Sequence, residues 1–235
     1  ADVYKRQGII GAMEMELDRL ISDMDVVEKK NVSFLDFYIG KLYSKDVVIV
    51  KSNEGKVNSA VATQILISNF DIQYVLNVGV AGSISDNLNV FDVAISNNTV
   101  EFDQDVSALG YEIGHTFGID KVRVPASDRL SVKIQSVCDK LSIKSEIGTI
   151  LSSDKFIVDK NEKETLKKKF NGIAIDIESA SINHVAYLNN KEFVTLRIIS
   201  DSGNNIEYRK FAEVATENIS RILKEYLEEE NIWKK

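Results

Sequence analysis

Apolar runs alternate with amphipathic segments along the chain from Gly8 to the last helix. Short apolar runs bounded by glycine or polar residues are typical of buried strands, whereas apolar residues three and four positions apart are typical of helices. The pattern predicts strands at residues 8–11, 47–52, 74–82, 92–101, 146–154, 172–178 and 192–201. It predicts a first helix that ends at Leu20 and further helices at residues 55–70, 127–141, 161–170, 179–188 and 208–230.

Apolar strands separated by helices indicate an α/β fold, in which a mixed, mostly parallel central sheet is flanked by helices. No internal repeat, low-complexity linker or shift in composition divides the chain, so we expect a single domain over residues 8–235. Arg6 and Gln7 stand where apolar residues would normally lead into the first strand. We therefore interpret residues 1–7, ADVYKRQ, as a non-native leader.

Composition and charge narrow the function classes. The 235 residues carry a net charge of −7 and no basic cluster that alternates with aromatics, so we expect no nucleic-acid partner. The one cysteine, Cys138, excludes an intrachain disulfide within this sequence, and its place on an apparent helix indicates a packed side chain. Two histidines and one cysteine disfavour a metal site, and we expect no cofactor. No apolar run is long enough to span a bilayer, and we expect a cytoplasmic protein without a membrane partner.

Candidate functional residues stand at the ends of the predicted strands, where sheets of this class usually bind ligands. The four segments are Glu16 after the first strand, the turn Gly79–Gly82, Asp176 with Glu178, and Ser200 with Asp201. Arg197 lies within the apolar strand that leads to Ser200, and an unpaired buried charge is costly. We therefore expect Glu178 and Asp201 to pair with it.

Each of these residues also has a purely structural interpretation. Glu16 can face the positive end of the helix dipole, and the glycines can simply tighten a turn. Glu178 can belong to a helix cap, and Asp201 can be a turn residue. Singly, these interpretations are the better ones for Glu16 and the glycines. Three acids and one arginine that converge on one edge of a sheet favour a site.

Seven segments, in this order, resemble the 5′-methylthioadenosine/S-adenosylhomocysteine nucleosidases of the nucleoside phosphorylase superfamily. They are GIIGAMEMELDRL, SNEGKVNSAVATQ, NVGVAGSI, DVSALGYEIG, SSDKFI, AIDIESASI and RIISD. The resemblance implies a nucleoside phosphorylase-like fold and hydrolysis of the N-glycosidic bond of 5′-methylthioadenosine and S-adenosylhomocysteine. It implies that small adenine nucleosides are the ligands, and that adenine and a 5-thioribose product are released in methionine salvage.

The resemblance also implies roles for the residues at the strand ends. Asp201 would protonate the leaving adenine, and Glu16 would activate the attacking water. Glu178 would bind the ribose hydroxyls, Arg197 would steady Glu178 and the water, and Ser200 would orient Asp201.

Further roles concern the base, the 5′ group and a second subunit. Phe156 would stack on adenine while the Ile157 backbone contacts its edge; simple core packing explains this pair about as well without the resemblance. The resemblance places Ile177 under the ribose, Val80, Ala81 and Gly82 in the turn beside the sugar, and Met13 and Tyr208 at the alkylthio end. Its dimer segment corresponds to Val106, Leu109 and Tyr111, which would reach the partner's site in a homodimer.

The chain departs from the family pattern at several positions. Ile177 stands where methionine is frequent, Val80 where serine is frequent, and Asp176 replaces a glutamate. Glu54 occupies a position that is apolar in the family and faces the 5′ substituent. Two interpretations stay open: Glu54 turns outward to water, or it meets a cationic 5′ arm. Two rival functions also stay open, a nucleoside phosphorylase of the same fold and a non-catalytic surface or storage relative.

Overall fold

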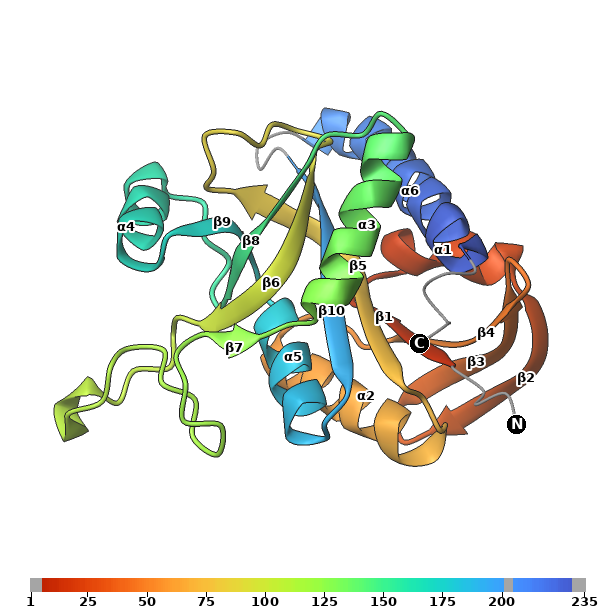
Figure 1. Cartoon of the computed structure of the whole chain (residues 1–235), viewed down its shortest axis with the longest axis horizontal. Helices are drawn as coiled ribbons and strands as arrows, with labels where there is room; N and C mark the ends of the chain where they lie inside the picture. The colour runs from red at the N-terminus through yellow and green to blue at the C-terminus, as the bar shows by residue number, and fades with distance from the viewer. Residues whose placement is uncertain (1–5, 201–204, 230–235) are drawn as a thin grey trace.

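The computed structural model describes residues 6–200 and 205–229, and for residues 205–208 it describes the backbone alone. Its strands belong to one ten-stranded sheet (Figure 1). They are β1 (Gln7–Gly11), β2 (Asp25–Val32), β3 (Leu35–Leu42), β4 (Lys45–Lys51), β5 (Tyr74–Ser83), β6 (Val93–Glu101), β7 (Val124–Pro125), β8 (Ser145–Ser152), β9 (Gly172–Asp176) and β10 (Glu192–Ile199).

The sheet is mixed, as the sequence predicts. Parallel pairing joins β10, β5, β1 and β4 in one run and β6, β8 and β9 in another. Antiparallel pairs connect the two runs, because β10 pairs with β6 and β5 pairs with β9. The strands β5, β9, β8, β6 and β10 therefore form a closed circuit, and the carboxyl ends of β5 and β10 meet beside the end of β9.

Helices cover both faces of the sheet (Figure 1). They are α1 (Glu14–Asp23), α2 (Lys56–Asn69), α3 (Asp128–Lys140), α4 (Lys160–Phe170), α5 (Ser179–Leu188) and α6 (Asn205–Glu228), with a short 3₁₀ helix η1 (Ser107–Leu109). The helices α1, α3 and α6 share one buried apolar cluster with the sheet, and α2 and α5 share a second. Cys138 is buried in the first cluster, which confirms the packed side chain expected from the sequence.

The predicted elements are present, and α5 covers the predicted residues 179–188. The sequence pattern missed β2 and β3, an antiparallel pair that continues the sheet beyond β4. Seven of the eight residues of β2 are exposed, so this edge strand carries no buried face that hydrophobic periodicity could reveal. In the described part of the chain, no helix combines the length and the apolar character needed to cross a membrane.

Candidate active site

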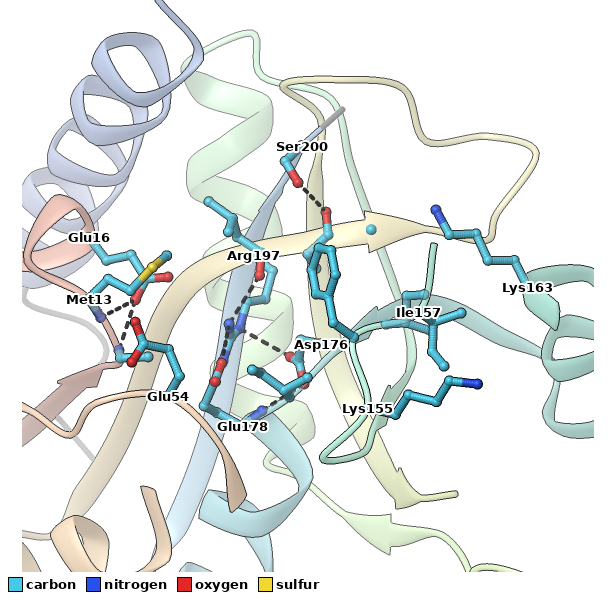
Figure 2. Close-up of a pocket in the computed structure, with 17 residues that line it drawn as sticks. Met13, Glu16, Glu54, Lys155, Ile157, Lys163, Asp176, Glu178, Arg197 and Ser200 are labelled. Carbon is cyan, nitrogen blue, oxygen red and sulfur yellow. Dashed lines mark hydrogen bonds and ion pairs between the residues drawn. The ribbon is translucent and has the colours of Figure 1, made fainter. Parts of the chain in front are cut away.

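A pocket of about 240 Å³ lies beyond the carboxyl ends of β1, β5, β9 and β10 (Figure 2). Most of the residues predicted to form the site line this one pocket. They are Met13, Glu16, Glu54, Val80, Ala81, Gly82, Phe156, Ile157, Ile177, Glu178, Arg197 and Ser200. The topology explains their convergence, because each follows or ends a strand at the same edge of the sheet or lies on a connection at that edge.

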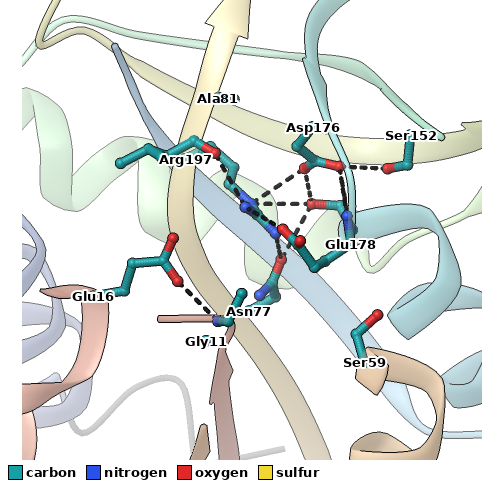
Figure 3. Close-up of polar contacts among 12 residues, drawn as sticks. Gly11, Glu16, Ser59, Asn77, Ala81, Ser152, Asp176, Glu178 and Arg197 are labelled. Atoms are coloured by element: carbon teal, nitrogen blue, oxygen red, sulfur yellow. Dashed lines mark hydrogen bonds and ion pairs between the residues drawn. The ribbon is translucent and has the colours of Figure 1, made fainter. Parts of the chain in front are cut away.

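Arg197 holds the centre of the site, as its place inside an apolar strand predicts (Figure 3). Its side chain is 1% exposed and every guanidinium nitrogen has a partner. Nη1 donates to Glu178 Oε1 at 3.2 Å and to the Val80 carbonyl at 3.1 Å, and Nη2 donates to Asn77 Oδ1 at 2.6 Å. Because these contacts satisfy the charge, the guanidinium is a fixed part of the site wall.

The second carboxylate partner of Arg197 is Asp176, at 3.2 Å from Nε. The sequence-based expectation named Glu178, which is confirmed, and Asp201, which lies outside the described residues. Asp176 also accepts hydrogen bonds from the hydroxyls of Ser152 and Ser179, so its buried carboxylate is held in place in the pocket wall. Burial alone opposes the charged form of Arg197, but the carboxylates of Asp176, Glu178 and Glu16 outweigh it and raise the pKa of the guanidinium.

Glu178 stands at the N-cap of α5 and is buried. Its carboxylate does not cap that helix. Oε1 instead accepts from Arg197, and Oε2 accepts from the Gly55 backbone amide at 3.0 Å. Burial raises the pKa of Glu178, with a further increase from Asp176, while Arg197 opposes both. The contact therefore joins the start of α2 to the start of α5 through a carboxylate that faces the pocket.

Glu16 is buried in the first turn of α1, and its Oε2 accepts from the backbone amides of Ala12 and Met13 at 2.8 and 3.2 Å. The structural interpretation of Glu16 at the helix start is thus correct as far as it goes. Burial raises the pKa of Glu16 to about 7, Arg197 opposes this increase, and the nearby Glu178 charge adds to it. A carboxylate with this pKa exchanges protons readily at neutral pH.

Gly79 keeps the space between these groups open. A Cβ at this position would lie 2.6 Å from Arg197 Nη1 and 2.9 Å from Glu16 Oε1, closer than such atoms approach. The turn predicted at Gly79–Gly82 is wrong, because these residues lie inside strand β5; Gly79 instead gives room for the close approach of two charged side chains.

The opposite side of the pocket is more open. Phe156 is 70% exposed although it lines the pocket, whereas Ile157 next to it is buried. Ser200 follows β10, and both its backbone amide and its hydroxyl donate to the Ala81 carbonyl. Lys155 and Lys163, from the loop after β8 and from α4, add positive charge to this side (Figure 2).

Met13 and Glu54 lie on the same side of the pocket as Glu16 (Figure 2). Glu54 lines the pocket and is exposed, and no hydrogen bond or ion pair to its carboxylate is found among the described residues. Glu14, in the first turn of α1, does not line the pocket and instead pairs with Lys51 at 3.0 Å.

Five predicted residues are not part of the described pocket. Asp201 and the side chain of Tyr208 lie outside the described residues. The predicted dimer residues lie in the segment 102–123 between β6 and β7, which projects from the body (Figure 1). They are Val106, Leu109 and Tyr111.

Several residues at the site were missed by the sequence argument. Asn77 and Ser179 contact Arg197 from inside elements, where a polar residue looks like an isolated core position. Asp176 was noted as a strand-end acid but not assigned a contact with Arg197. Lys163 sits in the charged helix predicted at residues 161–170, which is typical of solvated surface, and Lys155 directly follows the strand predicted at residues 146–154.

Comparison with known proteins gives matches over nearly the whole chain. Residues 6–228 match the phosphorylase superfamily. The 5′-methylthioadenosine/S-adenosylhomocysteine nucleosidase of Staphylococcus aureus (strain bovine RF122 / ET3-1) is 35% identical over 218 residues, covering 91% of this chain and 95% of that protein.

Solved structures agree with this match. A mutant MTAN of Helicobacter pylori, with 5′-methylthioadenosine in its active site, has a TM-score of 0.88 and 28% identity, covering 96% of this chain and 99% of that one. The 5′-methylthioadenosine/S-adenosylhomocysteine nucleosidase of Neisseria meningitidis, in complex with methylthio-immucillin-A, has a TM-score of 0.88 and 30% identity, covering 95% and 98%.

Proposed function

The chain belongs to the 5′-methylthioadenosine/S-adenosylhomocysteine nucleosidase family of the phosphorylase superfamily, and from this premise we propose that it hydrolyses the N-glycosidic bond of those two nucleosides. The products are adenine and the 5-thioribose compound, as methionine salvage requires. One observation carries the proposal: a buried carboxylate, Glu16, has a pKa near neutrality and faces the same pocket as the Glu178–Arg197 pair.

Hydrolysis of this bond needs two proton transfers. The C1′–N9 bond breaks with its electron pair going to the base, while a proton from a general acid reaches a ring nitrogen. Water attacks C1′ from the other face of the sugar and gives its proton to a general base. The sugar carries positive charge between these events, so carboxylates near the ribose stabilise the transition state.

Glu16 is the proposed base. Oε2 is fixed by two backbone amides, and Oε1 lies on the side of Gly79 and Arg197. This arrangement orients the carboxylate without neutralising it. Glu178 is the proposed ligand of the ribose hydroxyls, because Arg197 and the Gly55 amide hold its two oxygens in place while it lines the pocket.

Asp201 is the proposed general acid, on the strength of the family resemblance and its position directly after Ser200 in the sequence. An Asp201→Asn variant keeps the shape of the side chain and loses the transferable proton. Adenine release from 5′-methylthioadenosine should fall by roughly 10²–10⁴-fold, while adenine binding stays within a few-fold of wild type. A variant with near-normal turnover would assign the acid to another group.

The second candidate function is that of a nucleoside phosphorylase. Such an enzyme needs a cation near its phosphate, and Lys163 is a cation at the pocket that the sequence pattern did not reveal. Its Nζ lies 3.7 Å from the point where a Cβ on Gly82 would stand, so a cation is present beside the carboxyl end of β5. The ionised Glu16 carboxylate, however, would repel a phosphate in the position of the attacking water. Activity that requires added phosphate would establish the phosphorylase.

Glu54 points to a preference among 5′ substituents. It is an exposed carboxylate on the Met13 side of the pocket, where a methylthio group offers it nothing and an ammonium on a longer arm would be attracted. Exposure limits the gain to about 1 kcal/mol or less, roughly a few-fold in specificity. In Glu54→Ile, the ratio of kcat/KM for S-adenosylhomocysteine over methylthioadenosine should fall. An unchanged ratio would mean that Glu54 only faces water.

We also propose a homodimer in which the segment 102–123 completes the partner's site. Leu109 is 74% exposed, and the Tyr111 ring packs at 5.0 Å from the ring of Phe117 on the same projecting segment. Leu188 of α5 is also exposed and lies beside Gly118 of this segment. Clustered exposed apolar groups of this kind are typical of protein interfaces.

The dimer is tested with Leu109→Asp and, as a control, Val27→Asp on the exposed strand β2. The first variant should become monomeric in analytical ultracentrifugation and lose most of its nucleosidase activity, whereas the second should remain dimeric and active. A wild-type monomer with full activity would refute the shared site.

The proposed activity itself is tested by measuring adenine release from methylthioadenosine, S-adenosylhomocysteine and 5′-deoxyadenosine by the pure protein. We expect release from the first two substrates. The absence of adenine release from all three would refute the nucleosidase and favour the non-catalytic relative.

A further inference from the structure

The base end of the pocket contains a cation that the proposed chemistry does not yet use. Two lysines line this end, and their electrostatic situations differ. Lys155 Nζ pairs with Glu162 at 2.8 Å, which compensates its charge. Lys163 makes no side-chain hydrogen bond or ion pair with any residue in the described ranges 6–200 and 205–229, although it is half-buried. A half-buried charge without a partner is unfavourable, so an ammonium directed at a ligand pocket indicates a ligand with complementary negative charge.

Local structure fixes Lys163 in this place. Asp159 caps α4 by accepting from the Glu162 amide at 2.8 Å, and the Lys163 amide donates to the Asp159 carbonyl at 3.0 Å. The first turn of the helix is therefore well formed. The Lys163 side chain reaches the carboxyl end of β5, where Gly82 has no side chain and Nζ lies 3.7 Å from the position a Cβ would take (Figure 2). A larger residue than glycine at this position would narrow the space in front of the ammonium.

Helix stability does not explain a lysine at this position. The N-terminal turn of a helix favours acids, and a cation there opposes the helix dipole. The basic residues Lys167, Lys168 and Lys169 occupy the favourable last turn of the same helix. Lys160, the first residue of α4, opposes the dipole as well, so it is the position of Lys163 at the pocket that distinguishes it and indicates a role there.

We propose that Lys163 acts on the leaving base, where its ammonium stabilises the negative charge that develops on the purine as the C1′–N9 bond breaks. The inference rests on the proposed nucleosidase function. The electron pair of the broken bond stays on the base, and the general acid delivers the proton that neutralises it. Lys163 keeps its own proton and supplies a fixed positive charge before that delivery is complete.

This role separates the two ends of the pocket by charge. Carboxylates gather at the sugar, where positive charge develops, and a cation stands at the base, where negative charge develops. A field oriented along the breaking bond lowers the barrier more than either charge alone, because both ends of the dipole formed in the transition state are stabilised.

The test compares Lys163→Met and Lys163→Arg with Lys160→Met, an exposed lysine of the same helix that does not line the pocket. The substrates are 5′-methylthioadenosine and its 2-fluoroadenine analogue, whose base leaves more readily. Because the lysine is partly exposed, Lys163→Met should lower kcat/KM for methylthioadenosine by roughly tenfold, and clearly less for the fluorinated analogue. Lys163→Arg should retain most activity, and Lys160→Met should match wild type.

The dependence on the leaving group distinguishes this role from a structural one. Equal losses for both substrates in Lys163→Met, or no loss at all, would overturn the assignment while leaving the nucleosidase function intact. A wild-type protein that releases neither base would instead overturn the proposed function itself.

Discussion

The proposed sugar side and the proposed base side of the pocket are built in different ways. On the sugar side, Glu16, Glu178 and Arg197 are buried. Each makes hydrogen bonds: Arg197 donates to Glu178, and backbone amides near the starts of α1 and α2 donate to Glu16 and Glu178. On the base side, Phe156 is largely exposed and Lys163 has no partner among the described side chains. Three carboxylates, those of Glu16, Asp176 and Glu178, face one guanidinium on the sugar side.

This contrast indicates which side of the pocket lowers the folding stability of the protein. The sugar side has its hydrogen bonds and ion pairs in place before a ligand arrives. It buries more carboxylates than guanidinium groups, and burial of this excess negative charge lowers the folding stability. The exposed residues of the base side contribute little to folding stability, and they form their main interactions only with a bound ligand. Substitutions on the two sides should therefore separate stability from binding, and the following predictions use that separation.

The largest effect is expected from Arg197→Met. Removal of the guanidinium leaves Asp176 and Glu178 buried without their cation, so the free energy of unfolding should fall by roughly 3–5 kcal/mol. Urea denaturation measures this change. Arg221→Met, an exposed arginine on α6, is the control and should stay within about 0.5 kcal/mol of wild type. Equal stability of the two variants would contradict a preorganised sugar side.

Glu16→Gln should almost abolish hydrolysis without weakening adenine binding. The amide can still accept from the Ala12 and Met13 amides, but it cannot take a proton from water, so adenine release should fall by roughly 10²–10⁴-fold. Glu14→Gln, on the exposed face of the same helix turn, is the matched control. Similar activity in the two variants would return Glu16 to a purely structural role.

Activity and stability should change with pH in opposite directions. Glu16 acts as a base only when ionised, so kcat/KM should fall as the pH drops below its pKa of about 7. The same raised pKa means that the folded state favours the protonated acid. Its stabilising contribution is therefore complete below the unfolded pKa of about 4.5 and is lost as the pH rises toward 7, by at most about 3 kcal/mol.

The pH dependence is checked by kcat/KM profiles and by urea denaturation at pH 5 and pH 8, for wild type and for Glu16→Gln. The substitution should stabilise the protein at pH 8 more than at pH 5, because it removes the buried charge. A variant with the same change in stability at both pH values would show that Glu16 is not the group responsible.

The smallest effect on the fold is expected from Phe156→Ala. This ring is 70% exposed, so the free energy of unfolding should change by less than about 0.5 kcal/mol. If it stacks on adenine, the affinity for adenine should fall by roughly tenfold, as calorimetry can measure. Phe34→Ala, an exposed ring between β2 and β3, should change neither quantity. Unchanged adenine affinity in Phe156→Ala would remove this residue from the base site.

The sugar side was the more predictable half of the site. A charged residue inside the apolar run FVTLRIIS is a strong signal, and the structure confirms Glu178 as a partner of Arg197. The pattern did not reveal the contribution of Asn77, because register decides which side chains of neighbouring strands face one another: Arg197 pairs with Gly79 on β5, two residues from Asn77.

The base side was less predictable because its residues resemble ordinary surface. Lys163 belongs to the charged helix predicted at residues 161–170 and Lys155 to the connection before it, and only the fold brings both lysines to the pocket. The exposed strand β2 was missed for a related reason, since it buries almost nothing that a pattern could record. Hydrophobic patterns therefore predict buried residues well, but they do not identify exposed residues that have a function.

The identity of the sugar product tests the central claim most directly. The wild-type protein is incubated with 5′-methylthioadenosine in phosphate buffer and in phosphate-free buffer, and the products are identified by mass spectrometry. If Glu16 activates water, both reactions yield free 5-methylthioribose and adenine at the same rate. Formation of 5-methylthioribose 1-phosphate, or a reaction that stops without phosphate, would contradict the account.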